Sequence, residues 1–294
     1  MKSILEVDNL RKSFNRDRMV LDGVNLKVSS GDVYLLLGHN GAGKSTLFSI
    51  IVGLYQKYEG NLYFKGKKER SNIRISGFLE TPAFYPDLTG IDNLYISYGL
   101  RKQKPNRDII YEYSTKFNIY ESLEQKVGNY STGMVKRLGL VRSLLFDPDL
   151  IILDEPTNGL DPRGVMEMRN SISFISENLG KTILFSSHII AEAEKIASKV
   201  GILKNGQIIL EKEVNTRGKL ETVKIISSDA DRINNYLEQR KIGRIIERTT
   251  QGITYEIHKG TSEQLVTEII SNGMSLSEIY RIKDDLEKLY FDFN

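Results

Sequence analysis

Short aliphatic runs alternate with helical patterns along the first 200 residues of the chain. Asp32–Leu37 and Leu150–Leu153 carry aliphatic side chains at successive positions, which is typical of strands buried on both faces of a parallel sheet. Thr46–Leu54 instead has apolar residues at helical spacing. Thr182–Ser186 is a further predicted strand. This alternation of strands and helices predicts an α/β fold.

The opening of the chain predicts β-strands. Apolar residues stand among charged ones from Ile4 to Leu10, and Val20–Val28 alternates around Asp22-Gly23. Because Asp-Gly is a common turn dipeptide, we expect a turn there. Thr89–Phe117 has a mainly helical pattern, with Thr89 as a candidate N-cap.

The pattern changes again beyond Asn215, after a predicted hairpin at Val200–Leu210. The order β-α-β-β-α suggests a small split-βαβ module. The predicted strands are Glu221–Ser227, Ile242–Arg248 and Ile253–Ile257, and the predicted helices are Asp229–Arg240, Ser262–Ser271 and a terminal Asp284–Phe291. We therefore expect one domain over residues 1–214 and a small α+β accessory domain over residues 215–294. The second domain has no catalytic constellation, with His258 expected at its surface, so a regulatory or dimer-supporting role is predicted.

The amino-acid composition excludes several classes of function for this chain. The 41 Lys and Arg residues exceed the 38 Asp and Glu residues by only three, too small a surplus for an electrostatic nucleic-acid binder. The chain has no cysteine, which excludes disulfides, thiol nucleophiles and Cys-ligated metals, and only three histidines. Its apolar runs fall far short of the ~18 residues of a membrane-spanning helix. We expect a cytoplasmic protein without a membrane span.

A phosphate-binding loop follows the first doubly buried strand. Residues 38–45 read Gly-His-Asn-Gly-Ala-Gly-Lys-Ser, which satisfies G-x-x-x-x-G-K-[ST] between a predicted strand and a predicted helix. The glycines let backbone N–H groups point at phosphate oxygens, and the helix presents its positive end to the same anion. Lys44 adds a charge for the β- and γ-phosphates, and the Ser45 hydroxyl is a candidate Mg²⁺ ligand.

Two acidic residues follow the second doubly buried strand. Asp154 and Glu155 stand directly after Leu150–Leu153, and ligand-binding groups gather at the carboxyl ends of parallel strands. On a strand that neighbours the phosphate-binding loop, Asp154 is the candidate Mg²⁺ carboxylate and Glu155 the candidate general base. The separation of 110 positions from Lys44 to Asp154 (154 − 44) far exceeds one βαβ unit, so an inserted subdomain is expected.

Further motifs stand in a fixed order along this part of the chain. Residues 130–134 read Tyr-Ser-Thr-Gly-Met and open a predicted helix, residues 153–156 read Leu-Asp-Glu-Pro, residues 158–162 read Asn-Gly-Leu-Asp-Pro, and residues 186–188 read Ser-Ser-His. Together with the phosphate-binding loop, they make residues 1–214 similar to the ATP-binding subunit of an ABC transporter. In that family they are the signature motif, Walker B, the D-loop and the switch histidine.

The resemblance implies a P-loop NTPase cassette with a RecA-like core, an antiparallel β subdomain and a helical signature subdomain at about residues 88–146. It also implies an ATPase in which two cassettes meet head to tail around two MgATP, each ATP lying between one Walker A loop and the partner's signature. The dimer would be a homodimer or a pseudo-dimer with a related cassette. Separate transmembrane permease subunits would hold it at the cytoplasmic face of the membrane.

The resemblance also assigns roles to particular residues. Catalysis is expected from Glu155, His188 and Lys44, with Asp161 in the D-loop. Phe14 stands where the family stacks an aromatic ring on adenine, although a core phenylalanine is the alternative. The expected ATP-binding residues are Phe14, Gly38, His39, Asn40, Gly41, Ala42, Gly43, Lys44, Ser45, Thr46, Ser131 and Gly133. The expected Mg²⁺ ligands are Ser45, Glu80 and Asp154.

Two positions depart from the usual family pattern. The signature is usually Leu-Ser-Gly-Gly-Gln, whereas here Thr132 and Met134 replace a glycine and the glutamine; Ser131 and Gly133 are kept. Glu80 stands where the family has the Q-loop glutamine, and a carboxylate only accepts hydrogen bonds and carries charge. These features resemble the branch that exports bacitracin, lantibiotics and related peptides.

The sequence thus predicts an ATP-hydrolysing motor subunit of a multi-chain exporter of antimicrobial peptide or drug. The alternatives are a soluble ABC-type ATPase acting on nucleic acid or ribosomes, and an ABC exporter of lipid or ions. The surface near Phe84, Tyr85 and Tyr95 is a candidate contact for the permease, with ordinary core packing as the alternative.

Overall fold

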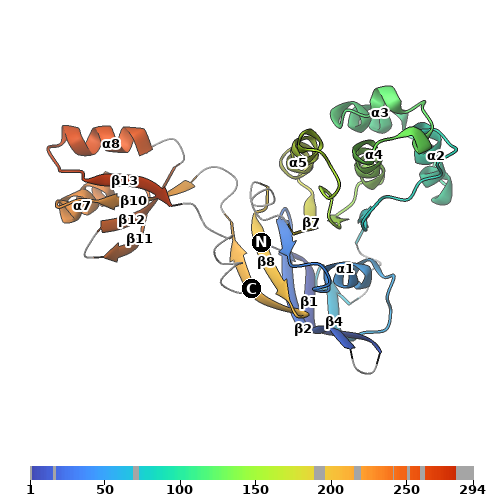
Figure 1. Ribbon diagram of the computed structural model, residues 1–294, viewed down its shortest axis with the longest axis horizontal. Helices are drawn as coiled ribbons and strands as arrows, with labels where there is room; N and C mark the ends of the chain where they lie inside the picture. Colours follow the sequence, from blue (N-terminus) through green and yellow to red (C-terminus); the bar gives the residue numbers. More distant parts are fainter. Residues whose placement is uncertain are drawn as a thin grey trace. The chain divides into compact units, whose positions relative to one another are not determined.

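The computed structural model forms two compact units, Met1–Glu213 and Val214–Asn294 (Figure 1). We describe each unit by itself. The structure describes residues 2–15, 18–68, 73–188, 196–214, 220–240, 242–249, 252–258 and 262–282.

A six-stranded sheet in the order β5-β6-β7-β3-β8-β9 is the centre of the first unit. Five of these strands run parallel and β9 joins the edge antiparallel to β8. Its strands are β3 (Val33–Leu37), β5 (Ile75–Phe78), β6 (Leu150–Leu153), β7 (Thr182–Ser187), β8 (Lys199–Lys204) and β9 (Gln207–Glu213). Every residue of β3, β6 and β7 is buried. The predicted doubly buried strands and the closing hairpin are therefore confirmed.

Helix α1 (Lys44–Val52) starts directly after the phosphate-binding loop and ends at Gly53. Its N-cap, Gly43, has φ +109°, a conformation that favours glycine. A Cβ atom at Gly43 would lie 2.7 Å from Leu21 Cδ2 and 2.9 Å from the carbonyl oxygen of Val20. The sequence therefore needs glycine here both for the backbone angle and for the space.

A three-stranded antiparallel sheet in the order β2-β1-β4 packs its apolar side chains into one core with α1. Its strands are β1 (Ser3–Asn15), β2 (Arg18–Ser29) and β4 (Glu59–Phe64). The turn expected at Asp22-Gly23 is wrong, because β2 runs through it. The pairing shifts register from Leu10 opposite Val24 to Arg11 opposite Asp22, so Gly23, with φ +77°, is an extra residue in a β-bulge.

The helices α2 (Gly90–Leu100), α3 (Arg107–Lys116) and α4 (Thr132–Leu144) gather on one side of this unit (Figure 1). The expected helical stretch over 89–117 is two helices, with Pro105 in the connection and Asn106 capping α3. Thr89 caps α2 as predicted, since its side chain accepts a hydrogen bond from the Asp92 amide. Short 3₁₀ turns at Tyr120–Ser122 and Val127–Asn129 lead into α4, and α5 (Pro162–Glu177) follows β6.

In its described residues, the second unit is a four-stranded antiparallel sheet in the order β11-β12-β10-β13, with two helices. It consists of β10 (Leu220–Ile226), α7 (Ala230–Arg240), β11 (Arg244–Thr249), β12 (Gly252–His258), α8 (Ser262–Ser271) and β13 (Glu278–Ile282). The predicted α+β fold is confirmed, with β13 as a strand that the pattern did not predict. The predicted terminal helix Asp284–Phe291 and the side chain of His258 lie outside the described residues.

None of the helices in the described residues is both long and apolar enough to cross a membrane.

Candidate functional site

The phosphate-binding loop connects β3 to α1 and holds its lysine in place. Lys44 is only 6% exposed, and its Nζ donates to the carbonyl oxygens of Gly38 at 2.6 Å and His39 at 3.3 Å. The amide of Ala42 donates back to the His39 carbonyl, which closes the loop into a turn. Gly41 and Gly43 have φ +83° and +109°. Such a curled backbone is what lets consecutive amides face one anion.

The Walker B strand is not the direct neighbour of the Walker A strand, contrary to our expectation. Strand β7 lies between β3 and β6, because parallel strands need not be neighbours in the order in which the chain reaches them. Ser186, near the end of β7, donates through Oγ to Asp154 Oδ1 at 2.5 Å and accepts from the Glu155 amide at 2.8 Å. The intervening strand thus fixes both acidic residues.

The Glu155 carboxylate lies between the side chains of Lys44 and His188. Its Oε1 is 3.2 Å from Lys44 Nζ, and its Oε2 is 2.8 Å from His188 Nδ1. Its backbone φ is +47°, in the left-handed region, and strain of this kind is usually found where the surrounding structure holds a functional group. The structure therefore brings together the three residues that the resemblance assigns to catalysis.

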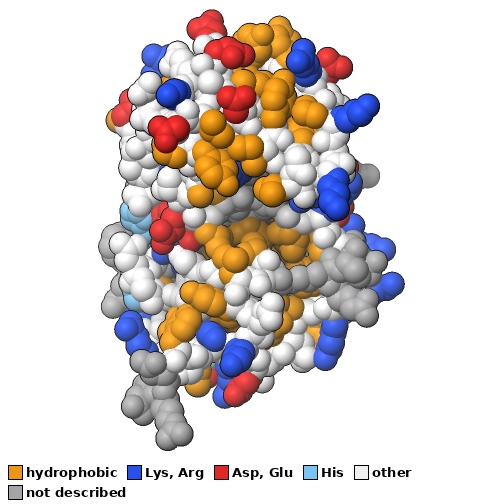
Figure 2. All heavy atoms as spheres, turned by 90° about the vertical axis from the view of Figure 1, so that its right-hand side faces the viewer, with side chains coloured by type: hydrophobic (Ala, Val, Ile, Leu, Met, Phe, Trp, Pro, Cys, Tyr) orange, Lys and Arg blue, Asp and Glu red, His pale blue; other side chains and the backbone are white. Residues whose placement is uncertain are grey.

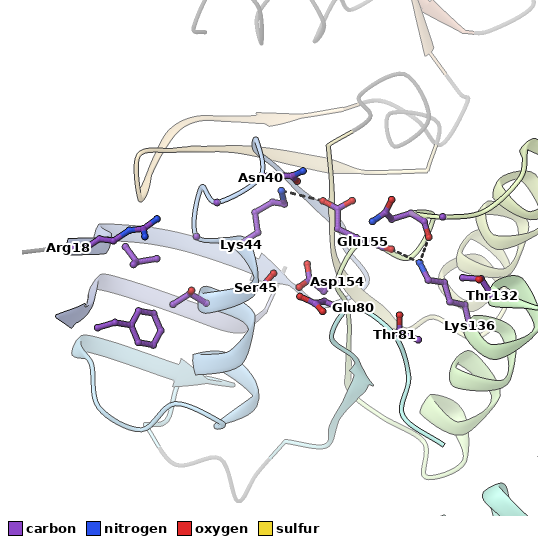
Figure 3. Close-up of a pocket in the computed structure, with 17 residues that line it drawn as sticks. Arg18, Asn40, Lys44, Ser45, Glu80, Thr81, Thr132, Lys136, Asp154 and Glu155 are labelled. Carbon is purple, nitrogen blue, oxygen red and sulfur yellow. Dashed lines mark hydrogen bonds and ion pairs between the residues drawn. The ribbon is translucent and has the colours of Figure 1, made fainter. Parts of the chain in front are cut away.

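A cavity of about 800 Å³ extends from Lys44 and Glu155 across the phosphate-binding loop, with His188 outside its lining (Figure 3). It contains Lys44, Asp154 and Glu155 with side chains from both the strands and the helices around it. The other lining residues are Phe14, Arg18, Val20, Asn40, Gly41, Gly43, Ser45, Thr46, Glu80, Thr81, Thr132, Lys136, Asn158 and Gly159. Of the expected ATP-binding residues, Gly38, His39 and Ala42 shape the loop from outside this lining, while Ser131 and Gly133 line the second cavity described below.

Phe14 forms the aromatic part of this cavity. Its side chain is 50% exposed, so it is not a core phenylalanine. Its ring packs edge-on against Tyr55 at 5.3 Å between centroids, and Lys12 Nζ lies 4.9 Å from the Phe14 centroid. With the Tyr55 contact in place, half of the Phe14 side chain remains exposed and accessible to a ligand.

The residues expected at the metal fit a divalent cation with oxygen ligands. Asp154 is fully buried, and its Oδ2 has no hydrogen-bond partner among the described residues. A buried carboxylate oxygen without a partner is costly unless a cation or donor takes it. Figure 3 draws Ser45, Asp154 and Glu80 on the same wall of the cavity. Glu80, the second residue after β5, is exposed and has φ +58°.

The signature residues line a second cavity, of about 670 Å³, which shares Thr132 and Gly159 with the first. Ser131 is the N-cap of α4, and its Oγ accepts from the Met134 amide at 3.3 Å. Asp161 is the N-cap of α5, and its carboxylate accepts from the Gly164 amide at 2.9 Å. Both helix N-termini therefore open on this cavity, whose lining includes Ser131, Thr132, Gly133, Gly159, Leu160 and Asp161.

Two residues near the acidic end of the first cavity were given no role from the sequence: Lys136, which lines the cavity, and Ser186, which lies outside its lining. Ser186 stands beside the expected switch histidine, but only the strand order places it on Asp154. Lys136 lies on α4, and it is 3% exposed. Burial lowers the pKa of Lys136 to about 8, while the carboxylates of Glu155 and Asp154 act in the opposite direction. A basic residue two positions after the signature was visible in the sequence, but its burial was not.

Comparison with known proteins agrees with this geometry. Residues 21–158 match the family described as ABC transporter. The chain is 40% identical over 221 residues to the lantibiotic transport ATP-binding protein SrtF of Streptococcus pyogenes, covering 74% of this chain and 94% of that protein. It is 33% identical over 314 residues to the bacitracin transport ATP-binding protein BcrA of Bacillus licheniformis, covering 99% and 97%. A solved nucleotide-free ATP-binding cassette from an ABC transporter matches 72% of this chain and 92% of its own, with a TM-score of 0.65 and 27% identity.

Both relatives are named as transport proteins, so the alternative of an ATPase acting on nucleic acid or ribosomes is not favoured. The predicted ABC cassette fold and ATPase activity coupled to transport are confirmed. The chain belongs to the ATP-binding subunits of ABC transporters, in the branch that includes the bacitracin and lantibiotic transport proteins.

Proposed function

We propose that two copies of this chain, or one copy and a related cassette, close head to tail around two MgATP. The observation that carries this proposal is that one chain holds two half-sites. One cavity is lined by Lys44 and Glu155, and a second cavity, which shares Thr132 and Gly159 with the first, is lined by Ser131, Gly133 and Asp161. Helix N-termini attract anions, so the signature half-site of one copy complements the phosphate-binding half-site of the other.

Glu155 is the proposed general base for the attack of water on the γ-phosphate. Its carboxylate accepts the proton, and the Nδ1 contact with His188 at 2.8 Å holds that carboxylate in position. His188, which is exposed and directly follows β7, also orients this water, from a direction that Glu155 does not occupy. Lys44 binds the β- and γ-phosphates and balances charge as the bond to the leaving oxygen lengthens.

The other expected binding residues contact the adenine end and the phosphate end of ATP. Phe14 stacks on adenine, while the amides of residues 38–46 surround the phosphates. Ser45, Asp154 and Glu80 would hold Mg²⁺, for which the unpartnered Asp154 Oδ2 provides a ligand. When bound, Mg²⁺ neutralises phosphate charge and fixes its orientation.

The proposed cargo is an antimicrobial peptide or a drug, exported through separate permease subunits. The names of SrtF and BcrA, transport proteins for a lantibiotic and for bacitracin, support it. The BcrA match spans 99% of this chain and so includes the second unit. We assign that unit a regulatory or dimer-supporting role.

The permease is proposed to bind the face shown in Figure 2, which places the chain at the cytoplasmic side of the membrane. Hydrophobic side chains gather on this face around a hollow. In the loop after β5, Tyr85 is 61% exposed, whereas Phe84 is half-buried under the Arg142 guanidinium, 4.4 Å from its ring centroid. Aromatic side chains are enriched at protein interfaces, which makes the exposed Tyr85 a candidate contact.

The Glu155→Gln protein tests the proposal in gel filtration with multi-angle light scattering, with and without MgATP. We expect a monomer that becomes a dimer only with MgATP, because the variant binds ATP and hydrolyses it only very slowly. The control is Glu177→Gln, a change at the end of α5 that should hydrolyse ATP as the wild type does. A monomer with bound ATP, or a dimer that ignores nucleotide, would contradict closure on two MgATP.

A further inference from the structure

The side chain of Lys136 reaches from α4 to the turn after β6. Its Nζ donates to the carbonyl oxygen of Glu155 at 2.9 Å and to that of Asn158 at 2.6 Å. Figure 3 shows it pointing from the helix toward these two residues at the wall of the first cavity. Lys136 is 3% exposed, and a cation is rarely buried so deeply without a specific partner.

The partners of Lys136 are backbone atoms rather than carboxylates. Within the described part of the chain, no carboxylate oxygen forms an ion pair with its Nζ. The Glu155 carbonyl also accepts from the Asn158 amide at 3.2 Å, so the lysine closes both ends of one four-residue turn. The same turn starts with Glu155 at φ +47°, a backbone angle that the surrounding contacts must hold.

Helix α4 connects this lysine to the second half-site. The helix starts at Thr132, with Ser131 as its cap, so Lys136 stands about one turn from the signature residues. A helix transmits a shift of its N-terminus along its length because its backbone hydrogen bonds keep it rigid.

We propose that Lys136 is a positioning residue that holds the turn of Glu155 and so ties the general base of each chain to the chain's own signature motif. This inference rests on the proposed function. In a head-to-tail dimer, the signature contacts the nucleotide of the opposite site. Lys136 then makes the position of Glu155 in one site depend on nucleotide in the other site.

The test compares Lys136→Met, which keeps the length and loses every donor, with Lys136→Arg, which keeps the charge and the donors. The control is Lys116→Met, since Lys116 lies on α3, is exposed, lies outside the lining of both cavities, and has its Nζ 4.3 Å from the ring centroid of Phe174. We expect Lys136→Met to lower kcat about 10- to 100-fold, the effect of a small misplacement of a catalytic group. KM for ATP should change less than about threefold, and Lys136→Arg should recover part of kcat.

Two further readouts separate positioning from a loss of folding. The Hill coefficient for ATP should fall toward one in Lys136→Met, at a temperature where circular dichroism shows a folded protein. In the Glu155→Gln background, Lys136→Met should add little further loss, because both changes remove the same step.

A wild-type kcat in Lys136→Met would overturn the inference, as would a kcat loss that is fully additive with Glu155→Gln. Failure of the proposed function appears differently, as wild-type hydrolysis by the single Glu155→Gln variant.

Discussion

Lys44 Nζ lies 3.2 Å from Glu155 Oε1, which pairs the cation of the phosphate-binding loop with the carboxylate at the end of β6. Both side chains are largely buried, at 6% and 15% exposure. A γ-phosphate that takes Lys44 therefore replaces one anionic partner by another and frees an oxygen of Glu155.

This competition predicts that Glu155→Gln binds ATP more tightly than the wild type. The amide removes a negative charge close to the phosphates and a rival for Lys44. We expect the Kd for ATP to fall roughly three- to tenfold, on the order of 1 kcal/mol for one partly buried pair. Titration of a fluorescent ATP analogue measures it, with Glu177→Gln as the control. An unchanged or higher Kd in Glu155→Gln contradicts competition for the lysine.

Glu80→Gln should change the metal dependence and leave ATP binding largely intact. A neutral amide is a weaker Mg²⁺ ligand than a carboxylate, but it repels phosphate less. We expect the Mg²⁺ concentration for half-maximal hydrolysis to rise several-fold. The measurement is the ATPase rate against the free Mg²⁺ concentration. The control is Glu124→Gln, a change at an exposed residue between the two 3₁₀ turns that precede α4. Identical titrations, together with unchanged stimulation by the permease, would remove Glu80 from the metal site.

Phe14→Ala should weaken the binding of ATP and of ADP to the same extent, because the lost contact is with the adenine base. Stacking of a base on an aromatic ring contributes roughly 1–3 kcal/mol, so Kd should rise about 5- to 100-fold. Equilibrium binding of both nucleotides is the measurement, and Phe14→Tyr should retain the affinity. If Phe14→Ala affected only ATP, the ring would lie nearer the phosphates than proposed.

Tyr34→Phe should destabilise the cassette, with a difference that narrows in alkali. Tyr34 is fully buried on β3, and its hydroxyl donates to Glu211 at 2.9 Å, so the variant should lose about 1–2 kcal/mol at pH 8. Burial, followed by the charge of Glu211, raises the pKa of Tyr34 well above 10. Above pH 10 the unfolded tyrosine releases its proton and the folded one does not, so wild-type stability falls there.

Urea denaturation of wild type and Tyr34→Phe at pH 8 and at about pH 10.5 measures this difference. Because the other tyrosines are common to both proteins, the comparison isolates Tyr34. A difference that grows with pH would mean that the hydroxyl ionises in the folded protein.

Local patterns were sufficient for most of the fold. The doubly buried strands β3 and β6, the phosphate-binding loop and the Thr89 cap depend on nearby residues, and the structure has them as predicted. Asp22-Gly23 is also a local signal, but pairing with β1 overrode it, because Gly23 fits a bulge as well as a turn. Strand β13 is defined mainly by its pairing with β10, which no short window of sequence contains.

The functional site shows the same contrast between what local sequence patterns predict and what depends on long-range strand pairing. The order of motifs predicted which side chains would meet, since Lys44, Glu155 and His188 lie together. The sequence did not predict that β7 separates β3 from β6 and supplies Ser186 to Asp154. Nor did it predict Lys136, because hydrogen bonds from a lysine to backbone carbonyls leave no pattern of residue types.

The carbonyl oxygens of Gly38 and His39 already hold the Lys44 ammonium within its own loop. A free lysine side chain carries about 2 kcal/mol of rotamer entropy, which an incoming phosphate would otherwise have to suppress. Here the chain loses that freedom when it folds. Nucleotide therefore meets an ordered cation, and its binding energy remains available for bringing the two cassettes together.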